Sequence, residues 1–217
     1  MTPAKMDWER VKRTGLPEAV YGEGKSLSQL AAILADAAET GRRLLVTRLT
    51  PERFQALPEE LKVRLDYDEE SRTAILGEAV IASHGIVTIV TAGLADMPVA
   101  GEVARTLAFS GVEARCVADV GVAGLWRLMD SLSEIREAEV VIAVAGMEGA
   151  LFSVLAGLVA APIIAVPTSV GRGVTEGGHV ALHSALGSCA PGLLTVNIDN
   201  GFGAAQAALR ILQRGRM

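Results

Sequence analysis

Residues 140–151 read VVIAVAGMEGAL, and residues 163–171 read IIAVPTSVG. Each segment opens with a run of aliphatic, mostly β-branched residues and then passes into a loop that contains glycine. A short apolar run of this kind is typical of a strand that is buried on both faces of a parallel sheet. A helix-length segment follows each loop. The two segments therefore predict neighbouring βα units.

The same pattern extends outward in both directions. Similar strand-like runs occupy residues 86–90, 114–118 and 193–197. Helix-length segments follow the five runs at about 98–110, 122–137, 148–160, 176–187 and 202–213. Alternation of strand and helix is the signature of a parallel sheet covered on both faces. We therefore expect an α/β domain over residues 83–217, with a flavodoxin-like, doubly wound parallel sheet.

Residues 1–82 carry most of the charge and are less regular. A helix is expected from about Leu27 to Thr40, with Ser26 as its N-cap and Gly41 at its end. A strand at 44–47, a short helix at 51–57 and a hairpin at 64–76 complete the expected elements. This part predicts a small N-terminal α+β module that packs on its neighbour.

Composition excludes several classes of protein. The net charge of −5 and the 4% content of aromatic residues argue against a nucleic-acid-binding surface. Two cysteines do not make a disulfide framework, and the apolar runs near 139–170 break before the ~20 residues of a membrane span. The charged N-terminus has no apolar signal-peptide core. We expect a cytoplasmic protein that binds neither nucleic acid nor membrane.

Ligands of doubly wound sheets bind beyond the carboxyl ends of the strands. The loops at that edge combine glycine with small polar residues, and each opens a helix; they span 91–98, 145–149, 167–173 and 199–203. Amides at helix N-termini favour anions. The loops therefore predict a phosphorylated small molecule as ligand. The chain lacks GxxxxGK[ST], and no GxGxxG follows its first long strand, which disfavours P-loop and ordinary Rossmann sites.

Two acidic residues of these loops have open interpretations. Glu148 directly follows a strand, so it is either a favourable acid in a first helical turn or a catalytic group. Asp96 precedes Pro98 and is either an N-cap or a site residue.

The two thiols are expected to differ. Cys116 lies inside a strand and is expected to be inert core, whereas Cys189 lies in a small-residue loop at a helix end. That position gives a thiolate no help from a helix dipole, so by position alone Cys189 is more readily structural. His179 and His183 lie four residues apart, but without a third ligand a solvated helix face explains them better than a metal site.

Several longer motifs of the chain resemble those of the LarB family, the pyridinium-3,5-biscarboxylic acid mononucleotide synthases of nickel-pincer cofactor biosynthesis. They are residues 21–25 (YGEGK), 97–100 (MPVA), 119–124 (DVGVAG), 144–151 (VAGMEGAL), 164–171 (IAVPTSVG), 188–190 (SCA) and 196–205 (VNIDNGFGAA). The resemblance covers nearly the whole chain.

This family is similar in its C-terminal domain to PurE, the aminoimidazole ribonucleotide (AIR) carboxylases and mutases. The resemblance implies a flavodoxin-like fold and a homo-octamer. PurE has a histidine about where Ala150 stands, and hydroxyl residues where this chain has Leu94 and Ala95. These departures count against purine biosynthesis. Leu94 and Ala95, with Trp126 and Arg172, also depart from the usual LarB pattern and concern details of substrate contact.

The implied reaction carboxylates nicotinic acid adenine dinucleotide with CO2 at pyridinium C5 and hydrolyses its phosphoanhydride, releasing AMP. No tightly bound cofactor is implied, and a magnesium ion at the anhydride is left open. The implied catalytic residues are Cys189, as a transient nucleophile at ring C4, Glu148, as the C5 base, and Asp96. The implied substrate-binding residues are Lys25, Gly93, Gly146, Met147, Thr168, Ser169, Gly171, Ser188, Asn200 and Gly201.

Two other functions remain open. A PurE-type AIR carboxylase or mutase would share the fold and the glycine-rich loops. A nucleotide-binding sensor domain would bind through the same loops, with Cys189 incidental to its function.

Overall fold

A computed structural model describes residues 5–78, 80 and 86–214, which form two compact units. Unit 1 comprises the chain up to residue 81 together with 109–111, and unit 2 comprises the remainder. Each unit buries an apolar cluster of its own. Among the helices of the described ranges, none is long and apolar enough to cross a membrane.

Unit 2 is built on a five-stranded sheet in which all strands are parallel. Its strands are β5 (Val87–Thr91), β6 (Ala114–Val117), β7 (Val140–Ala145), β8 (Ile163–Pro167) and β9 (Leu193–Thr195). Their order in the sheet is β6-β5-β7-β8-β9, which is the flavodoxin-like order 2-1-3-4-5. The predicted fold class is therefore confirmed.

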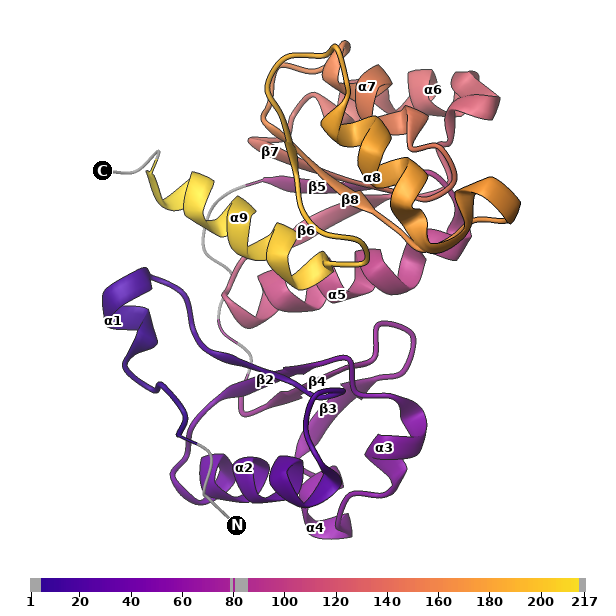
Figure 1. Ribbon diagram of the computed structural model, residues 1–217. Coiled ribbons are helices and arrows are strands. Elements are labelled where there is room, and N and C mark those ends of the chain that lie inside the picture. Colours follow the sequence, from indigo (N-terminus) through magenta and orange to yellow (C-terminus); the bar gives the residue numbers. More distant parts are fainter. Residues whose placement is uncertain (1–4, 79, 81–85, 215–217) are drawn as a thin grey trace. The chain divides into compact units, whose positions relative to one another are not determined.

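Helices cover both faces of this sheet (Figure 1). They are α5 (Met97–Phe109), α6 (Leu125–Ile135), α7 (Ala150–Ala156), α8 (His179–Leu186) and α9 (Gly201–Arg214), with 3-10 turns η1 (Leu94–Asp96), η2 (Val122–Gly124) and η3 (Gly173–Gly178). Helices α6, α7 and α8 share one apolar cluster with the sheet, and α5 and α9 lie on the opposite face. All residues of β5, β7 and β8 are buried, as their unbroken aliphatic sequences predict.

Three helices of unit 2 are shorter than expected, and one of them is α8 (His179–Leu186), which was expected at 176–187. The helix expected at 148–160 spans only Ala150–Ala156. It starts after Gly149, whose φ of 65° is left-handed, and its C-cap is Gly157. The helix expected at 122–137 begins with the 3-10 turn η2. Glycine explains the late starts of α7 and α6, because Gly149 (φ 65°) and Gly124 (φ −118°, ψ 64°) adopt non-helical backbone conformations.

Unit 1 contains a smaller, mixed sheet with the strand order β1-β2-β4-β3. Its elements are α1 (Arg10–Thr14), β1 (Ala19–Tyr21), α2 (Leu27–Glu39), β2 (Leu44–Thr47), α3 (Pro51–Gln55), α4 (Glu59–Lys62), β3 (Leu65–Asp68) and β4 (Thr73–Leu76). Ser26 and Gln29 form a capping box at α2, and β3 and β4 form the expected hairpin. The small α+β module is confirmed, although α1, β1 and α4 were not expected.

Candidate active site

A pocket of about 320 Å³ lies at the carboxyl edge of the parallel sheet in unit 2. The loops that follow β5, β6, β7 and β8 form it, and this edge, called the rim below, is where ligands bind in open α/β sheets. The predicted site residues that line the pocket are Gly93, Asp96, Gly146, Met147 and Glu148. The rim therefore brings two acids together in a lining made mostly of small and apolar residues.

Asp96 is the buried acid of the pocket, with 3% of its surface exposed. Its Oδ1 accepts a hydrogen bond of 2.7 Å from the Thr168 hydroxyl, and its Oδ2 accepts one of 3.0 Å from the Gly93 N–H. Burial raises the pKa of Asp96, while the two hydrogen bonds act in the opposite direction. The Asp96 carboxylate thus ties the loop after β5 to the loop after β8.

Gly146 is the point where two rim loops approach each other most closely. A Cβ atom at this position would lie 2.1 Å from the carbonyl oxygen of Val170 and 2.7 Å from the Thr168 hydroxyl. The next residue, Met147, donates its N–H to the Val170 carbonyl at 2.8 Å and has a left-handed φ of 53°. A side chain at Gly146 would therefore push the loops apart, so the pocket depends on glycine there.

Glu148 is the exposed acid of the pocket. It precedes Gly149, the N-cap of α7, so it lies in the loop and not in a first helical turn. A solvent-exposed carboxylate at the mouth of a pocket can accept a proton from a bound ligand and pass it to water.

The loop after β8 is fixed next to the pocket by hydrogen bonds to Asp96 and Asp199. Thr168 is fully buried against Asp96, and the N–H of Ser169 donates to Asp199 Oδ1 at 2.8 Å. Gly171 packs against the backbone of Thr175, because a Cβ there would lie 2.2 Å from the Thr175 carbonyl oxygen. The structure thus gives Thr168 and Gly171 clear roles in loop packing.

Asn200 and Gly201 lie at the start of α9. The Asn200 side chain accepts a hydrogen bond of 2.8 Å from the Gly203 N–H, which is an N-cap contact. Gly201 packs against α5, where a Cβ would lie 2.6 Å from the Val99 carbonyl oxygen, and Glu102 of α5 accepts the N–H of Phe202. These contacts build the end of a helix, and neither Asn200 nor Gly201 lines the described pocket.

Sequence reasoning missed three charged residues near the rim. Asp119, after β6, binds Arg127 of α6 with an Oδ2–Nη1 distance of 2.6 Å, and Asp199 anchors the loop after β8. Asp119 and Asp199 have left-handed φ values of 59° and 55°, as does the neighbouring Met147. Such strained residues concentrate at functional sites. Both aspartates lie in motifs quoted above, residues 119–124 and 196–205, but neither was singled out as a site residue.

Cys189 and Ser188 lie in the loop between α8 and β9. Because this loop leads into a parallel strand, it belongs to the amino edge of the sheet, whereas the pocket lies at the carboxyl edge. Ser188 Oγ is 2.8 Å from Ser153 Oγ of α7, and it accepts the N–H of Ala190. The Cys189 side chain is exposed. The fold therefore does not bring Cys189 into the pocket of its own unit.

The expectation that Cys116 is inert core is wrong, because its side chain is exposed. Cys116 lies on β6, which is an edge strand of the sheet, so β6 pairs with a strand on one side only. Partial desolvation nevertheless raises the pKa of the thiol.

Lys25 belongs to unit 1, in the turn between β1 and α2. Its carbonyl oxygen and that of Gly22 accept hydrogen bonds from Arg53, which fixes the backbone of this turn.

Among the described residues there is no group of three or more His, Cys, Asp or Glu side chains that could hold an ion. The rings of His179 and His183 on α8 are tilted relative to each other, with centroids 6.5 Å apart.

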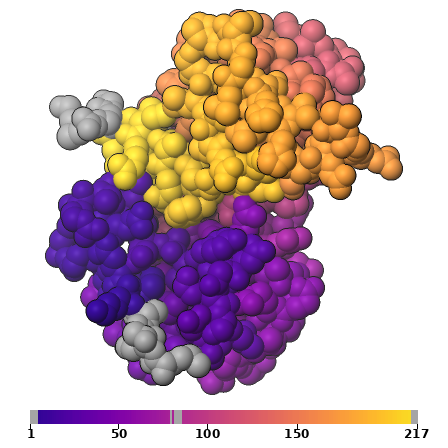
Figure 2. Space-filling model, in the orientation of Figure 1, coloured from indigo at the N-terminus to yellow at the C-terminus, as the bar shows by residue number. Residues whose placement is uncertain are grey.

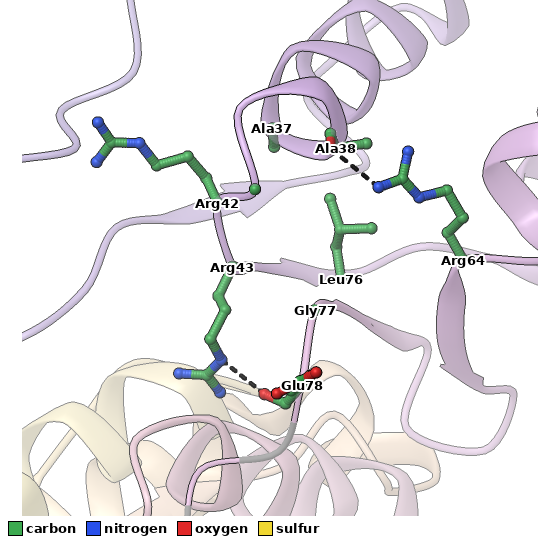
Figure 3. Close-up of a pocket in the computed structure, with 9 residues that line it drawn as sticks. Ala37, Ala38, Arg42, Arg43, Arg64, Leu76, Gly77 and Glu78 are labelled. Atoms are coloured by element: carbon green, nitrogen blue, oxygen red, sulfur yellow. Dashed lines mark hydrogen bonds between the residues drawn. The ribbon is translucent and has the colours of Figure 1, made fainter.

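A second, larger hollow of about 640 Å³ lies in unit 1 (Figure 3). It is lined by Arg42, Arg43 and Arg64 among small and apolar residues. Arg64 donates to the carbonyl of Ala38 at the end of α2, and Arg43 donates to the carbonyl of Glu78, as Figure 3 shows. The guanidinium groups of Arg64 and Arg43 already donate to backbone carbonyl oxygens, so fewer of their N–H groups are available to a ligand in this hollow.

Comparisons with known proteins cover both units. Residues 1–78 match the family model of the LarB/PurE-like N-terminal domain, and residues 86–216 match that of AIR carboxylase. An uncharacterized protein of Methanocaldococcus jannaschii is 40% identical over 210 residues, which is 92% of this chain and 80% of the relative.

Proposed function

Because the chain belongs to the LarB family, with an AIR carboxylase domain after a LarB/PurE-like N-terminal domain, we propose that it carboxylates nicotinic acid adenine dinucleotide at pyridinium C5. Hydrolysis of the phosphoanhydride then gives pyridinium-3,5-biscarboxylic acid mononucleotide and AMP. The family itself supports a carboxylase-type enzyme. The finer proposal rests on the pocket lining. Glu148 lines the pocket and can act as a base, and Ala150 lines it about where the PurE pattern has a histidine.

The chemistry of the ring explains why a thiol is needed. A pyridinium ring is electron-poor and cannot attack CO2. Addition of the Cys189 thiolate to C4 moves an electron pair onto the ring nitrogen and leaves an enamine whose C5 is nucleophilic. C5 then forms a bond to CO2, the C5 proton leaves to a base, and expulsion of the thiolate from C4 restores the aromatic pyridinium. The net change replaces the C5 hydrogen by a carboxylate and releases one proton.

Glu148 is the proposed base for the C5 proton. It lies in the pocket and is exposed, so it can take the proton from the ring and pass it to solvent. Asp96, the buried acid, is proposed to bind the ribose or a divalent ion that enters with the substrate. In this proposal the loops around Thr168 and Ser169 hold phosphate, and Lys25 reaches an anionic group of the dinucleotide.

The AIR carboxylase alternative is less well supported by the pocket. In the PurE pattern a histidine stands about where this chain has Ala150, and Ala150 lines the pocket. The described histidines, His179 and His183, lie on α8 and do not contribute to the lining. An aminoimidazole ring is already electron-rich and needs no thiol, so Cys189 would have no task in that reaction.

The direct test is incubation with ¹³C-bicarbonate and either nicotinic acid adenine dinucleotide or AIR. We expect AMP release and a ¹³C-labelled mononucleotide from the dinucleotide alone, measured by mass spectrometry. Carboxylation of AIR without AMP release from the dinucleotide would establish the alternative.

Two variants with matched controls separate catalysis from folding. Cys189→Ala is expected to abolish carboxylation and retain dinucleotide binding, whereas Cys116→Ala, at the other exposed thiol, is expected to stay active. Glu148→Gln is expected to slow turnover by about 10²-fold or more, whereas Glu134→Gln, at an exposed acid of α6, is not. An active Cys189→Ala variant would rule out the covalent route, and dinucleotide binding without turnover in the wild type would point to a sensor.

A further inference from the structure

The hollow of unit 1 has the volume of a site for a small organic molecule. It measures about 640 Å³, and ligand pockets commonly measure about 300–1,000 Å³. The residues that line it lie between positions 37 and 78, in the indigo to purple part of the chain in Figure 2. The hollow shares none of its lining residues with the rim pocket of unit 2. It therefore belongs to unit 1 alone.

The lining of the hollow carries an excess of positive charge. Arg42, Arg43 and Arg64 contribute guanidinium groups, and Glu78 is the acid among the lining residues. The whole chain has a net charge of −5, so this local excess differs from the general charge of the chain. Guanidinium groups bind phosphate and carboxylate oxygens through pairs of N–H donors. The lining therefore favours an anionic ligand.

Arg43 is a partly desolvated cation with neutral partners. Its Nε donates to the Glu78 carbonyl at 2.8 Å, and its Nη2 donates to the Phe109 carbonyl at 2.9 Å. Its guanidinium also lies 4.4 Å from the centroid of the Phe109 ring. Desolvation by burial lowers the pKa of Arg43. An anion interacts more strongly with a cation in such surroundings than with one in bulk water.

Arg43 and Arg64 keep N–H groups for a ligand. A guanidinium group carries five N–H donors. Arg43 uses two of them in the bonds described above, and Arg64 uses one Nη2 donor for the Ala38 carbonyl, at 2.9 Å. Figure 3 shows the two side chains on either side of Leu76. A ligand in the hollow thus has one guanidinium group at each end.

Arg42 is oriented differently from the other two arginines. It extends away from them in Figure 3, and its Cζ lies 5.4 Å from the centroid of the Trp8 ring. Arg42 therefore contributes to the local charge, while Arg43 and Arg64 are the groups that contact a ligand.

The surface between Arg43 and Arg64 is apolar. It is formed by Ala37, Ala38 and Leu76, each of which is at most 8% exposed. An inorganic anion alone would leave this surface and most of the volume unused. A ligand that combines an anionic group with a ring fits both the charge and the apolar surface.

Two glycines with left-handed backbone keep the hollow open. Gly41 has a φ of 63°, and a Cβ atom there would have no neighbour within 4 Å. Gly77 has a φ of 94°, and a Cβ atom there would lie 2.8 Å from Cγ of Arg43. The missing side chain at Gly77 thus makes room for the stem of Arg43.

We propose that the hollow of unit 1 binds a phosphate monoester of the nucleoside monophosphate class. Its phosphate contacts the Arg43 guanidinium, and its base lies on the apolar surface toward Arg64, whose planar guanidinium stacks on aromatic rings. AMP, which the proposed reaction releases, belongs to this class. The binding itself does not depend on that reaction.

Hydrogen exchange of the full chain, measured by mass spectrometry with AMP as the probe, locates the binding. We expect AMP to slow exchange in peptides that cover residues 37–43 and 73–78. Adenosine lacks the phosphate and inorganic phosphate lacks the ring, so each should protect these peptides less at the same concentration. Protection confined to the rim loops, or none, would overturn the proposal. Equal protection by inorganic phosphate would overturn the assignment to a nucleoside monophosphate.

Gly41→Asp and Gly41→Asn form a matched pair of variants. Asparagine and aspartate both tolerate a left-handed backbone, and at this position their side chains enter open space. Aspartate adds a negative charge to the lining and should weaken AMP binding about fivefold or more relative to asparagine, at low ionic strength. The AMP concentration for half-maximal protection of residues 73–78 is the measurement, with urea unfolding to compare the stability of the variants. Equal AMP affinities would contradict a site for an anion.

The same protein separates this proposal from the proposed function. AMP protection of residues 37–43 and 73–78 in a chain that neither fixes CO2 nor releases AMP from the dinucleotide would refute the function and retain the site. Carboxylation without protection of these peptides would retain the function and overturn the site.

Discussion

At the scale of single residues, the two acids of the rim pocket differ in their environments. Asp96 is buried and bonded to Thr168 and Gly93, whereas Glu148 faces solvent in the same pocket. By position alone each acid could be a helix-end residue or a site residue, and the resemblance implied catalytic roles for both; neither indicated that one acid is buried and the other exposed. The difference depends on contacts between loops that are 72 positions apart in the chain, such as Asp96 with Thr168.

Asp96→Asn is expected to stabilise the protein increasingly as pH rises. Burial raises the native pKa of Asp96, so the native state holds its proton more tightly than the unfolded state. The wild type therefore has its full contribution below the ordinary pKa of 3.8 and loses it as pH rises through the raised value. Asparagine carries no charge; its one carbonyl oxygen can accept from the Gly93 N–H, and its NH2 group can donate to the Thr168 hydroxyl.

The measurement is urea unfolding of Asp96→Asn and wild type between pH 4 and 8. The difference in the free energy of unfolding should grow with pH, while Asp130→Asn, at an exposed acid of α6, should show no such trend. A difference that shrinks with pH would contradict the raised pKa.

Gly146→Ala is expected to destabilise unit 2 by about 1–3 kcal/mol, because overpacking displaces neighbouring atoms. The added methyl group would lie 2.1 Å from the Val170 carbonyl oxygen, so the loops after β7 and β8 must separate. Carboxylation should fall with the change in pocket shape. Thermal unfolding and turnover are the measurements.

Gly157→Ala is the matched control, because a Cβ there has nearest contacts of 3.6 and 3.8 Å at an ordinary φ of −84°. It should change stability by no more than about 0.5 kcal/mol. Equal effects of the two substitutions would contradict the packing argument at Gly146.

At the scale of elements, aliphatic runs identified all five strands of unit 2. Most of these strands begin and end within about two residues of the predicted bounds. Short elements with little periodicity were missed, namely α1, β1 and α4. Three-residue β1 is stabilised by parallel pairing with β2, a contact that no local pattern reveals. The sequence partly indicated where Cys189 lies relative to the sheet, because its loop follows a helix and precedes a strand.

The start of α9 tests whether Asn200 caps a helix or binds substrate. Asn200→Ala should cost about 1 kcal/mol of stability through loss of the N-cap bond to Gly203. Asn200→Asp should restore most of that stability, because aspartate is an equally good N-cap. Chemical denaturation and the KM for the dinucleotide are measured on both variants.

Ser26→Ala, which removes the cap of α2 in unit 1, provides the comparison of similar cost. If Asn200 acts only as a cap, Asn200→Asp keeps the wild-type KM. A raised KM with normal stability would instead support the substrate-binding role that the motif suggested.

At the scale of the whole molecule, the resemblance to LarB identified the family, which the two domain matches confirm. Composition and spacing alone predicted only a phosphorylated ligand. Neither placed Cys189 outside the pocket, because which edge of the sheet a loop occupies follows from the direction and pairing of the strands. The homo-octamer remains a proposal, and light scattering should give a particle of eight chain masses.

The ion pair between Asp119 and Arg127 has a consequence for how fast ligands arrive. It pairs a cation beside the pocket with an acid, while Asp96 and Glu148 line the pocket and the chain carries a net charge of −5. Long-range attraction therefore does not guide an anionic dinucleotide toward the pocket, and recognition takes place only at contact. Added salt screens the repulsion over the Debye length. Stopped-flow association of the dinucleotide should accelerate, by about twofold, between low and physiological ionic strength, whereas a basic, steering rim would show slower association in salt.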